Sequence, residues 1–338
     1  MTIKDISALT GYSVGTVSRV LNNQPNVSAK ARQVILEVAR STGFHLNSNA
    51  KQLKQQHSNT ILVMVKGTSN QLFGSMVETL QSRMADNAHA LVVDYMDEES
   101  NEVLRALQLC LERKPLGILF LGGNRQNFLA DFDKIGIPCV LVTDDASGMP
   151  FGNLSSVTSD DRLAAKLAVD ALAERGHRQF AVIGGVRETS DTTSLRYRGC
   201  LDAFAAHGID FDSEDDYEDV RYSFQGGYQG ACNLLDRGRK FTALFAMSDV
   251  MALGAIRALN DRGIRVPEDV SVMGFDGLQF GEYLSPRLST VRQNAQQLAS
   301  RSIEILLEQI DGPKEPCYET IDVVIEPRES IRCVAESK

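Results

Sequence analysis

The sequence lacks the features of a membrane, secreted or metal-binding protein. No apolar run approaches the length of a membrane span, and no apolar signal region stands at the N-terminus. The six cysteines are scattered, without the C-x-x-C or histidine-rich spacing of a zinc site and without a disulfide framework. We therefore expect a cytoplasmic protein with reduced thiols, no metal site and no cofactor.

Features of an enzyme are also missing. No G-x-G-x-x-G follows a predicted strand, and the five histidines include no candidate catalytic residue with a partner, which argues against an NAD-type dehydrogenase. Residues 11–15 do match G-x-S-x-G, the nucleophile elbow of serine hydrolases. That elbow needs a preceding strand, whereas the residues before Ser13 have a helical pattern, so we interpret Ser13 as a helix cap. No catalytic residue is predicted.

The first 58 residues instead predict three short helices. Thr2 and Asp5 fit a capping box at the start of the first helix, and Gly11 suits the break before a second helix over 13–23. A third helix is predicted over about 28–42. The outer face of the second helix carries short, mostly polar side chains that could approach base edges closely. These features resemble a helix-turn-helix DNA-binding domain.

The charge distribution supports a nucleic-acid partner for this part of the chain alone. The whole chain has a formal net charge of −9, which by itself argues against nucleic acid. Residues 1–58, however, contain seven basic and two acidic residues, a net charge of +5 that leaves −14 on the remainder. A basic head on an acidic body is expected where only one module meets phosphate.

The body of the chain predicts parallel sheets. Short apolar runs alternate with longer helical patterns, which indicates strands covered by helices on both faces. These runs are 61–65, 91–93, 117–121, 139–142, 180–183, 243–246 and 270–274. They are too many for one modest sheet, so we expect an α/β fold with two Rossmann-like subdomains and a cleft between them. The acidic stretch 212–219 is interpreted as a solvated loop.

Motifs along nearly the whole chain resemble the LacI/GalR family of bacterial repressors. The matching segments are 2–6, 11–22 and 27–28 in the head, and 175–177, 248–255 and 266–276 in the body. The resemblance implies a core of the periplasmic-binding-protein type, with the chain crossing between its two lobes near 158, 290 and 322. It implies a helix-turn-helix domain over 1–45, a hinge helix or linker over 46–58, and an effector-binding and dimerisation core over 59–338, with an N-subdomain of about 59–158 and 291–321 and a C-subdomain of about 159–290 and 322–338.

Contacts to DNA are expected from the second helix and the hinge. Arg19 could pair with a guanine edge and Val14 could contact a thymine methyl group, while hydroxyl groups anchor phosphates. In the family a hinge leucine wedges into the minor groove, and the matching residue is Leu53, although Leu46 stands where the family usually has proline. Gly15 either lets the helix sit deeper or lacks a contact that relatives make. The predicted set is Thr2, Ser13, Val14, Gly15, Thr16, Ser18, Arg19, Asn22, Asn47, Ala50 and Leu53.

A second set of residues is expected to bind a small effector. Carboxylates and a guanidinium can grip neighbouring hydroxyl groups, and they stand here at predicted strand ends and helix starts, where open α/β sheets bind ligands. Arg196, Asp276 and Asp144 match effector-binding positions of the family, and Tyr222 matches an aromatic wall of its pocket. Phe73 could supply a second aromatic wall, and Ser248 stands where sugar-responsive relatives often carry asparagine. Asp144 could equally be a turn aspartate. Lys66 could meet an anionic ligand such as a sugar phosphate, but a surface lysine is the favoured interpretation.

The resemblance implies a dimeric transcriptional regulator, with repression favoured over activation. It would bind a pseudo-palindromic operator, and a carbohydrate effector would change its DNA affinity by shifting the two lobes. The alternative is a solute-binding protein without regulatory DNA binding, against which the basic head and the missing signal region argue.

Overall fold

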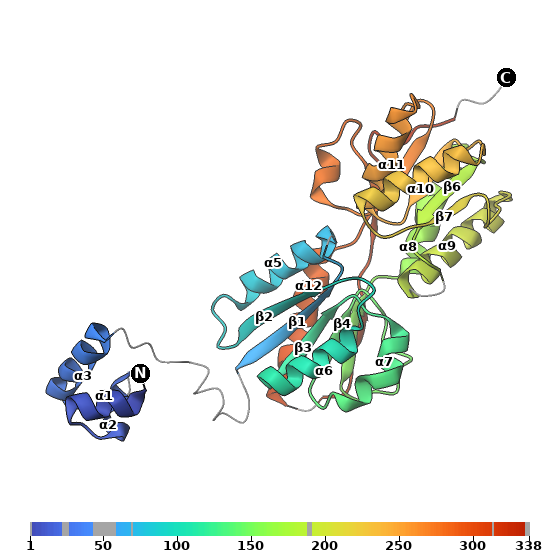
Figure 1. The fold of residues 1–338 in the computed structure, drawn as a ribbon. Coiled ribbons are helices and arrows are strands. Elements are labelled where there is room, and N and C mark those ends of the chain that lie inside the picture. The colour runs from blue at the N-terminus through green and yellow to red at the C-terminus, as the bar shows by residue number, and fades with distance from the viewer. Residues whose placement is uncertain are drawn as a thin grey trace. The chain divides into compact units, whose positions relative to one another are not determined.

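The structure, a computed structural model, describes residues 2–21, 27–42, 59–68, 70–187, 191–312 and 314–334. The chain forms two compact units, 1–58 and 59–338. Both units are visible in Figure 1.

The first unit contains three helices around a small apolar core. They are α1 (Ile3–Thr10), α2 (Val14–Leu21) and α3 (Ala29–Ser41). Side chains from all three helices form the core, namely Ile6, Val17, Val20 and Ile35. The predicted capping box between Thr2 and Asp5 is present, and Gly11 ends α1 with a φ of 70°, which costs glycine little.

The second unit contains two sheets. The first has the order β11-β5-β4-β3-β1-β2 and is parallel throughout. Its strands are β1 (Thr60–Lys66), β2 (Ala90–Met96), β3 (Gly117–Leu121), β4 (Cys139–Val142), β5 (Leu154–Thr158) and β11 (Tyr318–Thr320).

The second sheet has the order β12-β10-β9-β8-β6-β7, in which only the edge strand β12 runs antiparallel. Its strands are β6 (Phe180–Gly184), β7 (Tyr217–Asp219), β8 (Ala243–Ala246), β9 (Ser271–Asp276), β10 (Ser289–Arg292) and β12 (Val324–Glu326).

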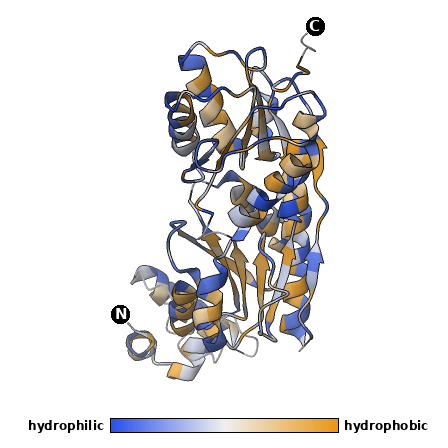
Figure 2. Ribbon diagram, turned by 90° about the vertical axis from the view of Figure 1, so that its right-hand side faces the viewer, coloured by the Kyte–Doolittle hydropathy of each residue, from blue (hydrophilic) through white to orange (hydrophobic). Residues whose placement is uncertain are grey.

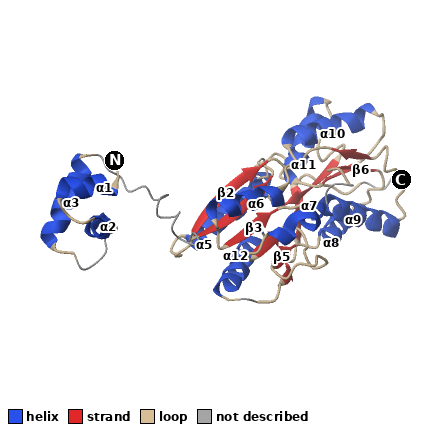
Figure 3. Cartoon of the chain, turned by 60° about the horizontal axis from the view of Figure 1, so that its bottom comes forward, coloured by secondary structure: helices blue, strands red, loops and turns tan. Residues whose placement is uncertain are grey.

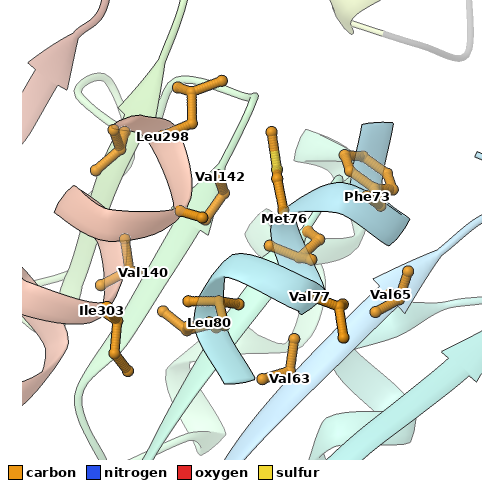
Figure 4. Packing of buried hydrophobic residues seen from close by; sticks show 14 of the residues in the cluster. Val63, Val65, Phe73, Met76, Val77, Leu80, Val140, Val142, Leu298 and Ile303 are labelled. Carbon is orange, nitrogen blue, oxygen red and sulfur yellow. The ribbon is translucent and has the colours of Figure 1, made fainter. Parts of the chain in front are cut away.

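Helices cover both faces of each sheet. Alternate residues of β1 show why, because Val63 packs against α5 (Gln71–Met84) and α12 (Ala295–Asp311), whereas Met64 packs against the opposite pair of helices. That pair is α6 (Glu102–Arg113) and α7 (Arg125–Asp131), followed by the short η1 (Phe132–Lys134). Figure 4 shows the packing beneath α5, and Figure 2 shows the apolar strands between more polar helix surfaces.

The second sheet is covered in the same way. The helices α8 (Asp161–Ala173) and α9 (Asp191–His207) pack on one face. The helices α10 (Phe224–Asp236) and α11 (Asp249–Asp261) pack on the other, and η2 (Gln279–Glu282) follows β9. Figure 3 shows these helix and strand layers.

The chain passes three times between the two lobes. It leaves the first sheet between β5 and α8, returns between β10 and α12, and leaves again between β11 and β12. The lobes are therefore joined by three short crossings. Within the part of the chain that the structure describes, no helix is long and apolar enough to cross a membrane.

The prediction of a solvated loop over 212–219 holds for 212–215, where Asp212, Glu214 and Asp215 are exposed, but it was wrong for 216–219. Tyr217–Asp219 forms β7, and the side chains of Asp216 and Glu218 are nearly buried. Asp216 pairs with Arg239 at 2.8 Å, and Glu218 pairs with Arg237. Two arginines from a later segment compensate these acidic side chains, so the local charge run did not reveal the strand.

Candidate functional site

The first candidate site is the exposed face of α2 in the helix-turn-helix unit. Ser13 caps this helix, since its Oγ accepts a hydrogen bond from the Thr16 backbone N–H at 3.2 Å and lies 2.9 Å from Thr16 Oγ1. Val17 and Val20 are buried, while Val14, Gly15 and Arg19 are exposed. The side chains free to meet a groove are therefore short ones and one guanidinium.

The other predicted DNA contacts are distributed as follows. Thr2 is exposed at the start of α1, and Thr16 and Ser18 are half-buried on α2. Four residues lie outside the described residues, namely Asn22, Asn47, Ala50 and Leu53. The predicted hinge over 46–58 lies outside them as well.

The second candidate site is a cleft of about 960 Å³ between the two lobes of the core. Its walls come from loops that follow the carboxyl ends of strands in both sheets, as expected for open α/β sheets. All six residues that the sequence analysis selected line this cleft: Phe73, Asp144, Arg196, Tyr222, Ser248 and Asp276. The fold thus brings together side chains that are up to about 200 positions apart.

Arg196 is a buried cation held rigidly in the cleft. Its Nε donates to Asp161 Oδ1 at 2.7 Å, and its Nη1 donates to the Met247 carbonyl at 2.6 Å. The guanidinium carbon lies 3.7 Å from the centroid of the Phe275 ring, so the group is also stacked. Asp161 is buried too, and burial raises its pKa. Arg196 is therefore oriented before any ligand arrives.

Asp276 ends β9 beside Arg196. Its Oδ1 accepts a hydrogen bond from Gln293 Nε2 at 2.9 Å, and burial raises its pKa to about 7. The residue has a φ of 115°, an uncommon conformation for any residue but glycine. A carboxyl group with such a pKa can accept a hydrogen bond from a hydroxyl group or, when protonated, donate one to it.

Asp144 connects the two lobes. Its Oδ2 accepts from the Gly123 backbone N–H at 3.1 Å, within its own lobe. Its Oδ1 accepts from Thr192 Oγ1 at 2.8 Å, and Thr192 belongs to the other lobe. Burial raises the pKa of Asp144 to about 7. This residue is thus more than a turn aspartate, because it spans the cleft.

The remaining three predicted residues shape the cleft. Tyr222 lies with its hydroxyl 3.0 Å from Thr193 Oγ1, and Phe73 supplies a largely buried ring from α5. Ser248 is the N-cap of α11, and its Oγ accepts from the Met251 backbone N–H at 3.3 Å. Two of the three are therefore aromatic walls, whereas Ser248 also orients a helix.

Lys66 is not a surface lysine, contrary to the favoured interpretation. It ends β1, lines the cleft and pairs with Glu102, whose side chain is fully buried. Sequence analysis missed Glu102 because an acidic residue in the first turn of a helix is ordinarily a favourable contact with the helix dipole.

A second ion pair missed by the sequence analysis crosses the mouth of the cleft. Arg221 Nη2 lies 2.7 Å from Asp97 Oδ2, and its Nε pairs with Glu98. Arg221 follows β7 in one lobe, whereas Asp97 and Glu98 follow β2 in the other. We call this contact the cleft latch.

The fold and the site define a class of protein: a helix-turn-helix unit followed by a two-lobed core of the periplasmic-binding-protein type. Family models match accordingly, as "Bacterial regulatory proteins, lacI family" over residues 2–47 and "Periplasmic binding protein-like domain" over 169–331. A relative from Clostridium butyricum, the HTH-type transcriptional regulator MalR, is 32% identical, and the match covers 98% of this chain and 99% of the relative. The chain belongs to the lacI family of bacterial regulatory proteins.

Solved structures agree with this assignment. The lac repressor dimer bound to operator and the anti-inducer ONPF has a TM-score of 0.78 and 25% identity, with 98% of this chain and 99% of that chain covered. The complex of the transcriptional regulator CelR with cellobiose has a TM-score of 0.73 and 26% identity, with the same coverage. The chain is thus a DNA-binding transcriptional regulator.

Proposed function

We propose that this regulator is a repressor that binds a pseudo-palindromic operator as a homodimer, and that a carbohydrate in the cleft modulates its DNA affinity. The observation that carries the proposal is the convergence of Asp144, Arg196 and Asp276 on one cleft between two lobes. Carboxylates and a guanidinium, each able to engage neighbouring oxygens, suit a ligand rich in hydroxyl groups. The solved complex of a relative with cellobiose supports this ligand class.

The domain division belongs to this proposal. Residues 1–45 would bind DNA, 46–58 would form the hinge, and 59–338 would bind the effector and dimerise. The separation of unit 1–58 from unit 59–338 supports it, as do crossings of the core chain close to 158, 291 and 321. The N-subdomain would be about 59–158 and 291–321, and the C-subdomain about 159–290 and 322–338.

On DNA, the exposed face of α2 would read the major groove. Arg19 would pair with a guanine edge and Val14 would contact a thymine methyl group, while Ser13 and Thr16 would lie near phosphates. Leu53 of the hinge would enter the minor groove at the operator centre. Two-fold symmetry then places two recognition helices on adjacent half-sites, and the solved dimer of a relative on its operator supports that arrangement.

The ligand acts by binding one arrangement of the lobes better than another. Asp144 and the cleft latch contact both lobes, so a ligand that competes for Asp144 or separates the latch shifts their relative position. The shift would be transmitted to the hinges and hence to the spacing of the two recognition helices.

The test is selection of bound duplexes from a randomised DNA library by the full-length protein, with and without pools of neutral sugars and sugar phosphates. We expect enrichment of a pseudo-palindrome whose recovery changes with one pool. Asp276→Ala should enrich the same sequence but lose the response to the pool. A library without enrichment under any condition would refute the proposed function, and a variant that still responds would refute the role of Asp276.

A further inference from the structure

The cations that line the cleft are paired with carboxylates, and this pairing bears on the charge of the ligand that the cleft can bind. Three cations line the cleft in the described residues, and each has a carboxylate partner: Lys66 with Glu102, Arg196 with Asp161, and Arg221 with Asp97 and Glu98. Asp144, Asp276 and Glu99 also line it, without an ion-pair partner among the described residues. The walls therefore carry more acid than base.

The pair of Lys66 and Glu102 is the decisive one. Glu102 begins α6, and its fully buried carboxylate accepts three hydrogen bonds. The donors are the Lys66 ammonium, the Asn124 backbone N–H at 2.6 Å and Asn127 Nδ2 at 3.0 Å. An anionic ligand that recruited Lys66 would leave this carboxylate without its cation in a buried place, which is costly. The charge of Lys66 is thus neutralised by Glu102 and is not available to a ligand.

The charge of Arg196 is neutralised in the same way, by Asp161. An anionic group that took its guanidinium would strip Asp161 of its charge partner, and both side chains are about 95% buried. The same group would also lie near Asp276, which brings a like charge whenever it is ionised. The three paired cations and the three additional acids disfavour phosphate and carboxylate ligands, whereas hydroxyl groups can form hydrogen bonds with groups of both kinds.

We propose that the cleft selects an uncharged, hydroxyl-rich ligand over phosphorylated or carboxylated sugars, and that Glu102 determines this selectivity by neutralising Lys66. The inference rests on the proposed function and names the class of ligand for the same site. Glu102 is a selectivity residue that acts through Lys66, because it does not itself line the cleft.

The test measures binding of defined sugars to the full-length protein by calorimetry. The neutral probes are cellobiose, maltose, galactose and ribose, and the anionic probes are glucose 6-phosphate and galacturonate. We expect the wild type to bind a neutral probe at least tenfold more tightly than any anionic one. In Glu102→Gln, we expect the ratio of anionic to neutral affinity to rise at least tenfold, because the Lys66 charge is released.

Two control variants separate this effect from a structural one. Glu112→Gln removes an exposed carboxylate from the same helix and should leave the ratio unchanged. The double variant Lys66→Gln/Glu102→Gln lacks the released charge and should return the ratio to the wild-type value. If Glu102→Gln does not fold, the affinity ratios of the wild type and of Lys66→Gln test the proposal. A Lys66 that is already neutralised by Glu102 does not bind the anion, so Lys66→Gln should bind anionic probes as well as the wild type does.

The outcomes separate this inference from the proposed function. A wild type that prefers an anionic probe, or a folded Glu102→Gln variant with an unchanged ratio, overturns the selectivity but leaves a carbohydrate-responsive regulator. Failure of every probe to bind, or of the library selection to enrich a sequence, counts against the proposed function itself.

Discussion

Asp276 combines three constraints at one residue: a positive φ, a buried carboxyl group and a neighbouring guanidinium. Its φ of 115° turns the end of β9 so that the side chain points into the cleft, beside Arg196. Such a conformation costs on the order of 1–3 kcal/mol and persists only where the surroundings enforce it. Asparagine tolerates positive φ better than most residues, so it is the substitution of choice for testing the charge alone.

The pKa of Asp276 leads to a pH prediction. Burial raises this pKa from 3.8 to about 7, so the folded state binds a proton more tightly than the unfolded state. Its contribution to stability is therefore full below about pH 4 and is lost as the pH rises through 7. We expect the Tm difference between Asp276→Asn and the wild type to be a few degrees more positive at pH 8 than at pH 5. Calorimetry at the two pH values measures this difference. An equal effect at both pH values would contradict the raised pKa.

Arg19 is the best single residue for testing DNA recognition. A bidentate contact between arginine and guanine is worth about 1–3 kcal/mol of discrimination, which is about 5- to 150-fold. We expect Arg19→Ala to lower operator affinity by this factor while binding to random duplexes changes little, in fluorescence anisotropy. Arg40→Ala, on the exposed face of α3, serves as the control. Equal losses on both DNAs would make Arg19 a phosphate contact only.

The residues of the cleft differ in how far the sequence could predict them. Arg196 and Asp276 stand at positions that match family motifs, and their charges suggest a polar ligand even without a structure. Glu102 follows the N-cap Asn101, where an acid is unremarkable in sequence. Its importance arises from Lys66, which is 36 positions away in the chain and is brought near by the pairing of β1 with β2, in which Lys66 lies opposite Met96. Only the fold reveals such a partnership.

Two helix pairs of the second lobe depend on glycine for their close approach. A Cβ on Gly254 of α11 would lie 2.1 Å from the Phe224 carbonyl oxygen, and one on Gly227 of α10 would lie 2.1 Å from that of Met251. At Gly199, on α9, a Cβ would lie 2.1 Å from the Arg162 carbonyl oxygen. The obstacles are backbone atoms, so the helices themselves would have to separate.

Gly254→Ala should consequently destabilise the core. We expect a loss of about 1–3 kcal/mol in the free energy of unfolding, because overpacking displaces backbone. Gly74→Ala on α5 is the matched control, since a Cβ there would meet nothing within 4 Å and alanine favours a helix. Urea unfolding of both variants checks the prediction. A shift of the urea midpoint in the same direction for both variants would contradict it.

Gly15 permits a test on the recognition helix. A Cβ there would meet only Ser13 Oγ at 3.8 Å, an ordinary contact, and alanine in a helix is about 1 kcal/mol better than glycine. We expect Gly15→Ala to stabilise the helix-turn-helix unit by up to about 1 kcal/mol in thermal unfolding. If operator affinity falls at the same time, the bare backbone serves close approach to DNA; if it does not, a side-chain contact is merely absent.

The elements themselves were predictable in unequal measure. Continuous apolar runs such as 61–65 and 117–121 revealed the central strands, which are buried on both faces. The edge strands β7, β11 and β12 have only three residues each and mix polar with apolar side chains. Their conformation depends on a neighbouring strand far along the chain, as when β11 pairs with β5, so local composition could not indicate them.

At the scale of the whole molecule, the two lobes are joined by three chain crossings and by the ion pairs of the cleft latch. We expect Arg221→Ala to increase the dissociation rate of a bound neutral sugar several-fold, because Asp97 and Glu98 then lose their ion-pair partner in the other lobe. Stopped-flow fluorescence measures this rate. Arg262→Ala, which breaks the exposed pair with Asp236 within one lobe, is the matched control. Identical rates in both variants would show that the latch does not retain the ligand.

The latch has a further consequence because its side chains are exposed at the mouth of the cleft. Dissolved ions weaken attraction between exposed charges, and the screening distance shrinks from about 10 Å at 0.1 M salt to about 3 Å at 1 M. A higher salt concentration is therefore expected to weaken the ion pairs of the cleft latch without any change in the ligand concentration. If a sugar acts by shifting the two lobes, as we propose, salt acts on the same shift, and operator binding would then depend on ionic strength as well as on the sugar.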